Sequence, residues 1–298
     1  MGDVAPPSES RAREVNTGLT RFAARTPTLP PATHTNSYAL GGRDVLLVEP
    51  ATPFEDEQRA WIDWARSLPS TGRRPIAIFA THYHPDHIGG LDALSLALGL
   101  PVWAHAETSR RIGEDKVDRR LTDGETLVLD GPSPQSWRVL ETPGHAWGHL
   151  CLWEQTSRVV VVGDMVASEG TIVIAPGDGD MRLYLEQLAR LSNLNAILAL
   201  PAHGDPITDP NALFQRYIAH RLAREAKVLA AVASACATSP DGVTDFDLVP
   251  IAYADTPTPL WPFARLSLQA HVAKLMGEGS VVEEQGLYRL PKGHQSIP

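Results

Sequence analysis

The segment THYHPDH at residues 81–87 constrains this chain more than any other stretch of its sequence. It places three histidines and an aspartate within six positions, directly after the apolar run PIAIFA at 75–80. A short apolar run bounded by turn residues predicts a buried strand. A histidine of the hydrophobic core would occur alone, and a solvated charged segment would need no buried strand before it. The segment therefore indicates a metal site at the exit of a strand.

Three further candidate ligands follow apolar runs in the same way: His145 in TPGH, Asp164 in VVVVGD and His203 in ALPAHG. Each has Gly or Pro beside it, as expected where backbone passes close to a site. His82 and His84 are two residues apart, so on an extended segment their side chains face the same way. The seven candidates suit two ions: His82, His84 and His145 for one, Asp86, His87 and His203 for the other, and Asp164 as a bridge between them.

Imidazole and carboxylate ligands of this kind suit two divalent ions, with Zn²⁺ favoured and Fe or Mn left open. Two-metal hydrolytic sites hold their ions about 3.5–4 Å apart. The pKa of a water bound there falls towards roughly 7, which makes it a nucleophile at neutral pH. We expect Asp86 and His87 to be required for catalysis, because they would hold the second ion.

Residues outside this set carry weaker signals. The candidate substrate contacts are Asn36, Trp147 and Arg221. Trp147 could equally pack in the core. The helical stretch that contains Arg221 is favoured to pack the C-terminal domain against the catalytic one rather than to contact phosphate. The remaining histidines are expected to be structural or solvated, as a lone histidine usually is: His34, His105, His149, His220, His271 and His294.

Strands and helices alternate along most of the chain, and polar residues recur at strand exits, which predicts a layered α/β architecture with function on the loops at one sheet edge. Residues 1–32, rich in Pro, Ser, Thr and Arg, predict a loose lead-in. Residues 33–210 then form the predicted catalytic domain. Residues 211–298 read as three helices and a two-strand wing, a second domain of ordinary size.

The motifs THYHPDHIGG, TPGH, GD and PAHG, in this order, resemble the signature of the metallo-β-lactamase fold superfamily. The resemblance implies an αββα sandwich with its metal site at the edge of the sheets, over about residues 35–210. Three segments, TNSYAL at 35–40, EGTIVI at 169–174 and YIAHRLAREAKVL at 217–229, are similar to the beta-lactamase-like protein 2 subfamily. That subfamily carries a C-terminal winged-helix domain, which the helices after residue 211 match.

The resemblance implies a hydrolase whose metal-bridging hydroxide attacks a small-molecule thioester or ester, of the acyl-CoA or acyl-carrier type. The alternative within the same subfamily is an endoribonuclease acting on single-stranded RNA. Less favoured are an iron-dependent persulfide dioxygenase and a catalytically inactive metal-binding protein. Asp164 stands where lactamases with a cysteine ligand have that cysteine. Glu49 departs from the Asp of many members, which lengthens the usual support of the site.

Composition narrows the partners. The net charge of −9 disfavours nucleic acid without excluding a local basic patch. Two distant cysteines, no apolar signal segment and no run of about 20 apolar residues favour a cytoplasmic protein that does not cross a membrane. The oligomeric state and the purpose of the Gly-rich loop 175–180 are left open.

Overall fold

A computed structural model describes residues 11–291 of the chain. The chain divides into two compact units, each described here by itself. Of these residues, the first unit, called the sheet unit, takes 11–142, 147–172 and 194–211. The second, called the helical unit, takes 143–146, 173–193 and 212–291.

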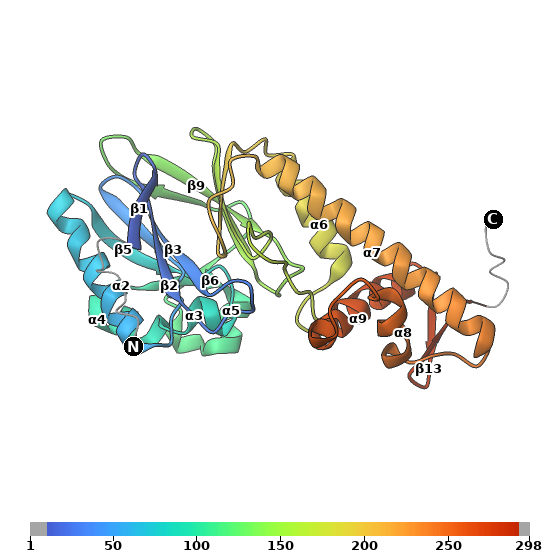
Figure 1. The fold of residues 1–298 in the computed structure, drawn as a ribbon. Helices are drawn as coiled ribbons and strands as arrows, with labels where there is room; N and C mark the ends of the chain where they lie inside the picture. The colour runs from blue at the N-terminus through green and yellow to red at the C-terminus, as the bar shows by residue number, and fades with distance from the viewer. Residues whose placement is uncertain (1–10, 292–298) are drawn as a thin grey trace. The chain divides into compact units, whose positions relative to one another are not determined.

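The sheet unit contains two sheets, visible in Figure 1. The larger has seven strands in chain order: β1 (Ala12–Asn16), β2 (Leu19–Arg25), β3 (His34–Leu40), β4 (Asp44–Val48), β5 (Arg74–Phe79), β6 (Val102–His105) and β7 (Arg119–Leu121). The smaller has the order β12 (Leu198–Pro201), β11 (Val159–Gly163), β10 (Leu150–Glu154), β9 (Gln135–Glu141) and β8 (Thr126–Leu129). In the larger sheet β1–β4 pair antiparallel and β4–β7 parallel, so β4 and β5 end at one sheet edge.

Each face of the larger sheet packs in an apolar core of its own, because the side chains of a strand point alternately to the two faces. Leu46 and Val48 of β4 belong to an apolar cluster with residues of the smaller sheet, such as Trp137 and Val161. The intervening Val45 and Leu47 pack in a second cluster with side chains of α2 (Glu55–Ser67) and α4 (Leu91–Leu98). Because successive side chains of a strand point to opposite faces, the sheet is buried on both sides. The buried strand expected at 75–80 is present as β5.

The expectation of a loose lead-in is wrong for residues 12–25, which form β1 and β2 of the larger sheet. Their apolar residues are spaced for a strand: Phe22 and Ala24 are fully buried and pack with Trp64 of α2. The flanking residues Thr20, Arg21 and Arg25 hide this strand pattern in the sequence. Residues 1–10 of the predicted lead-in lie outside the described part of the chain.

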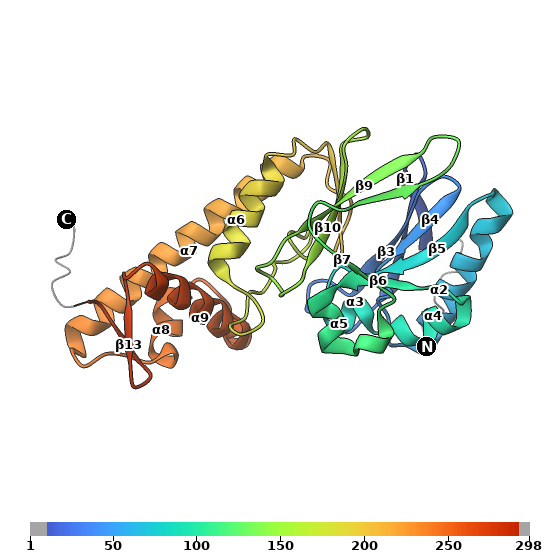
Figure 2. The same cartoon turned by 180° about the vertical axis from the view of Figure 1, so that it is seen from behind.

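The helical unit is formed by α6 (Met181–Ser192), α7 (Pro210–Thr238), α8 (Asp245–Ala252), α9 (Trp261–Gly277) and the hairpin of β13 (Val282–Glu284) with β14 (Leu287–Arg289). Figure 2 shows α7 running alongside α8, α9 and this hairpin. Their core includes Val228, Leu248 and Leu268. The backbones of Val243 and Tyr288 exchange two hydrogen bonds, which tie the hairpin to the start of α8. Three helices and a wing are thus present, as expected.

Short elements complete the chain: α3 (Pro85–Ile88), α5 (Ala106–Ile112), η1 (Leu68–Thr71), η2 (Glu114–Lys116) and η3 (Thr258–Leu260). None of the helices among residues 11–291 is both long and apolar enough to cross a membrane.

Candidate metal centre

The cluster at 82–87 stands at the exit of β5, where the chain leaves the buried sheet. Residues 80–84 connect β5 to α3, a single helical turn that begins at Pro85. Proline suits the first position of a helix, because its fixed φ is already helical and its missing N–H would have no partner there. This turn places Asp86 and His87 near His82 and His84 in space as well as in sequence.

Asp86, His87 and His203 form one group whose potential ligand atoms all lie within 4.8 Å of one another. His87 Nε2 lies 3.8 Å from Asp86 Oδ1, and His203 Nε2 lies 3.5 Å from Asp86 Oδ2. Asp164 faces both rings as well, with oxygens 3.5 Å from His87 Nε2 and 3.4 Å from His203 Nε2. These separations exceed ordinary hydrogen-bond lengths. The polar atoms of the four side chains thus face a common point.

In both His87 and His203, the ring nitrogen that faces away from the common point lies close to an oxygen atom. His87 Nδ1 lies 3.1 Å from Glu49 Oε1, and His203 Nδ1 lies 3.0 Å from the carbonyl oxygen of His34. A ring nitrogen beside such an oxygen carries the proton, so the lone pair of the neutral ring is on Nε2. Metal-binding histidines are commonly oriented in this way. Glu49 is itself fixed by the Thr81 hydroxyl, which donates to Oε1 at 2.5 Å.

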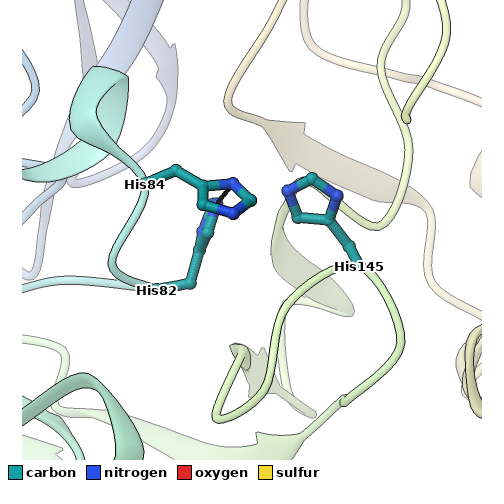
Figure 3. Close-up of side chains that lie close together, drawn as sticks. All are labelled: His82, His84 and His145. Atoms are coloured by element: carbon teal, nitrogen blue, oxygen red, sulfur yellow. Dashed lines mark hydrogen bonds between the residues drawn. The ribbon is translucent and has the colours of Figure 1, made fainter. Parts of the chain in front are cut away.

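His82, His84 and His145 form a second group of potential ligand atoms within 4.8 Å of one another, and Figure 3 shows their rings turned toward a common point. His82 Nε2 and His84 Nδ1 lie 3.0 Å apart. His145 Nδ1 lies 3.0 Å from the carbonyl oxygen of Val173, which again leaves Nε2 for a ligand. A third group of potential ligand atoms joins Glu49, His82 and His87, so His82 lies near His87 as well. Which of these residues bind metal, and in which division between two ions, stays a prediction.

The charges around His87 favour a bound cation. Burial alone would lower the pKa of His87, but the carboxylates of Asp164, Asp86 and Glu49 raise it well above its ordinary value. The pKa of His203 is raised in the same way against its burial, chiefly by Asp164. Burial would raise the pKa of Asp164, yet His203 and His87 hold it well below its ordinary value. Three carboxylates thus converge on one buried ring, and together they favour positive charge there.

The geometry therefore fits a divalent ion. Within residues 11–291, His87 Nε2 is buried with no hydrogen-bond partner, although the nearest carboxylate oxygens lie just beyond bonding distance. Such an atom is expensive to bury unless something binds it. An ion at the common point of Asp86, His87, His203 and Asp164 would satisfy that nitrogen and balance the carboxylates. The His/Asp/Glu groups are positioned for metal binding, and the ligand types leave the metal's identity open.

The three expected substrate contacts are placed differently. Asn36 is buried, and its side-chain amide donates to the carbonyls of Pro201 and Gly204, so it supports the turn that carries His203. Arg221 is also buried, with its guanidinium 5.5 Å from the ring centre of Tyr184 in the helical unit, which favours packing over contact with phosphate. Both expectations of a substrate contact lose support because neither side chain is exposed. Trp147 is half-buried and stays a prediction.

The Gly-rich loop at 175–180 has a structural purpose that its sequence did not disclose. The amides of Asp178 and Gly179 donate to the carbonyl of Ala175, which closes the loop tightly. Asp180 then caps α6, its carboxylate accepting from the amide of Leu183 at 2.8 Å. The loop therefore begins a helix.

Sequence reasoning missed His149, which it left as a structural histidine. Its Nε2 accepts a hydrogen bond from the backbone amide of Asp164 at 3.1 Å, so it contacts a candidate ligand directly. The signal was its place in TPGHAWGH, four residues after His145. Only the fold shows which of the two histidines faces which partner.

Residues 30–203 match the family model described as the metallo-beta-lactamase superfamily, and residues 244–289 match the beta-lactamase associated winged helix domain. A beta-lactamase-like protein 2 homolog from Caenorhabditis elegans is 28% identical over 90% of this chain and 87% of its own length. An atrochrysone carboxyl ACP thioesterase from Aspergillus chevalieri is 29% identical over 66% of this chain, which spans 60% of that relative.

Solved structures resemble the chain over nearly its whole length. A metallo-beta-lactamase family protein from Thermus thermophilus has a TM-score of 0.72 and 26% identity, covering 93% of this chain and 100% of that one. A beta-lactamase domain protein from Burkholderia ambifaria has a TM-score of 0.80 at 22% identity, covering 97% and 96% of the two chains. The second likeness shows the fold alone.

Proposed function

Because this chain belongs to the metallo-beta-lactamase superfamily, we propose that it is a metal-dependent hydrolase of small-molecule thioesters or esters, such as acyl-CoA or acyl-carrier conjugates. The observation that carries the proposal is the pair of side-chain groups at the strand exits, one built around Asp86, His87 and His203 and the other around His82, His84 and His145. We propose these residues and Asp164 as the ligands of two divalent ions, with Zn²⁺ favoured.

Two ions held in this way would supply a nucleophilic water at neutral pH and a Lewis acid for the carbonyl. The chain's own contribution is orientation. Glu49 and the carbonyl oxygen of His34 hold the rings of His87 and His203 with Nε2 toward the common point. Asp86 and Asp164 present oxygens to both rings and set the negative charge there. Rings fixed from behind need no reorganisation when substrate arrives.

Three observations support an acyl substrate over RNA. A relative with 29% identity is named an acyl-carrier thioesterase. The net charge of −9 opposes a phosphate backbone. Arg221 on α7, the candidate for a phosphate contact, is buried. We further propose a cytoplasmic location from the cysteine usage.

The winged-helix match keeps the ribonuclease as a second candidate, since that module often binds nucleic acid. On α7, Arg224 donates to both oxygens of Asp255, and Lys227 lies 2.7 Å from the same carboxylate, so these two cations are already paired. Paired cations contribute little to the binding of a polyanion, because the neighbouring carboxylate repels it.

The deciding experiment measures turnover of metal-loaded protein on a panel of acyl-CoA thioesters beside a labelled single-stranded RNA, with metal content determined on the same sample. We expect thioester cleavage that a chelator abolishes, with the RNA intact. Cleavage of RNA in a salt-sensitive manner, with the thioesters inert, would replace this proposal by the ribonuclease.

A further inference from the structure

His149 is fully buried and belongs to none of the three groups of potential ligand atoms among residues 11–291. It nevertheless lies against the chain that carries a candidate ligand. Its Nε2 accepts from the backbone amide of Asp164 at 3.1 Å, and its Nδ1 lies 2.8 Å from the hydroxyl of Thr142. Both ring nitrogens therefore have a partner within hydrogen-bond distance.

The position of one proton fixes the rest of this arrangement. A backbone amide can only donate, so His149 Nε2 must be the acceptor and must lack a proton. The proton of the neutral ring is then on Nδ1, where it donates to Thr142 Oγ1. The backbone reinforces the pairing, since the amide of Thr142 donates to the carbonyl of His149 at 2.8 Å.

A series of hydrogen bonds leads from Thr142 back to β11, the strand that precedes Asp164. Thr142 Oγ1 lies 3.3 Å from the sulfur of Cys151, within the longer range of sulfur contacts. The Cys151 thiol in turn donates to the carbonyl of Val162 at 3.7 Å. Val162 and Asp164 flank Gly163 at the end of β11. The series of hydrogen bonds therefore begins at the amide of Asp164 and ends at the carbonyl of Val162, two residues apart at the end of β11.

Gly163 shows that this turn is shaped around the ring of His149. A Cβ at that position would lie 2.6 Å from His149 Nε2 and 3.0 Å from Thr81 Oγ1. Gly163 also has a φ of +48°, in the left-handed region that favours glycine. The imidazole thus packs directly on the backbone that precedes Asp164, with no room for another side chain between them.

We infer that His149 is a positioning residue for the metal centre, and that Thr142 selects its tautomer. The inference rests on the proposed metal centre and adds to it a residue that holds a ligand in place without binding metal itself. By accepting from the Asp164 amide, His149 fixes the turn from which the Asp164 carboxylate faces both His87 and His203. Loss of such supporting partners lowers metal affinity by roughly 10–100-fold in known sites.

Metal affinity tests the inference without any substrate. Zinc titration of metal-free protein would compare wild type with His149→Phe, which keeps a ring but removes the acceptor, and with His149→Gln, whose amide oxygen can still accept from Asp164. We expect His149→Phe to bind the tighter zinc ion about 10–100-fold more weakly, and His149→Gln to recover most of the loss. His220→Gln on the exposed face of α7 is the control. Wild-type affinity in folded His149→Phe would overturn the inference.

A second measurement covers the case in which His149→Phe does not fold. Nitrogen-15 NMR of histidine-labelled wild-type protein should report His149 protonated on Nδ1 alone, and Thr142→Val should remove that preference while Thr142→Ser keeps it. A proton on Nε2 in the wild type would contradict the inference. Neither measurement involves turnover, so failure of the thioesterase proposal leaves both results interpretable. A wild type that binds no zinc would instead refute the metal centre itself.

Discussion

His87 of the sheet unit and His271 of the helical unit are both fully buried, and each lies beside a glutamate. His87 Nδ1 is 3.1 Å from Glu49, and His271 Nδ1 is 3.4 Å from Glu225. Their pKa values nevertheless move in opposite directions. Burial lowers the pKa of His271, whereas the pKa of His87 is raised despite its burial.

The difference comes from what else surrounds each ring. Glu225 is already paired with Lys274 at 2.7 Å, and the positive charges of Arg221 and Lys274 oppose protonation of His271. Around His87, the carboxylates of Asp164, Asp86 and Glu49 all act in the other direction and favour its protonated form. A buried histidine with balanced neighbours is structural, and one on which carboxylates converge is placed for a cation. The local charge balance, more than burial, separates the two roles.

The largest expected effect comes from breaking the charge arrangement around His87. Replacing Asp86 with Ala removes a carboxylate that faces both His87 and His203, so the second ion should be lost and turnover should fall by more than about 100-fold, beyond the usual effect of losing a supporting partner. His87→Ala should behave alike. Metal content and thioester turnover are the measurements. Asp92→Ala, at an exposed aspartate six residues away, is the control, and surviving turnover in Asp86→Ala would disprove the two-metal centre.

A smaller effect is expected from unbalancing the region around His271. Lys274→Met would leave Glu225 mostly buried beside His271 without its cation, and should lower the free energy of unfolding by about 2 kcal/mol, below the range for a fully buried pair because the site is partly exposed. Zinc content should not change. Lys116→Met, which breaks an exposed pair with Asp92, should have an effect below about 1 kcal/mol in the same urea titration. Equal losses in the two variants would remove the contrast between the regions.

The smallest expected effect is a pair of opposite pH dependences in metal-free protein. The raised pKa of His87 gives stability that is present below its unfolded value of 6.5 and is lost as the pH rises through its folded value. The lowered pKa of His271 gives stability that is present above 6.5 and is lost as the pH falls toward its folded value. Urea unfolding of wild type, His87→Gln and His271→Gln between about pH 5 and 8 should show each slope disappear in its own variant. Slopes of the same sign would contradict the comparison.

Much of the site could be predicted from residue order alone. An apolar run followed by His, Asp, Gly or Pro indicates a strand and the loop after it. A buried strand needs apolar side chains, whereas the loop at its end does not. The prediction of a loose lead-in failed for the converse reason: β2 buries Phe22 and Ala24, but Thr20, Arg21 and Arg25 flank them and make the segment resemble a polar sequence. The supporting carbonyls of His34 and Val173 could not be predicted at all, since every residue has one.

The sequence by itself determined which side chains could serve as ligands and the order in which strands would bring them to one edge, because residue type and periodicity are local properties. Only the tertiary structure decided that Asn36 and Arg221 are buried supports and that His149, four residues after His145, accepts from the amide of Asp164. Those roles depend on which oxygen, amide or ring a fold places within about 3 Å of each side chain. Such proximity joins residues that are distant in the chain, and no local pattern encodes it.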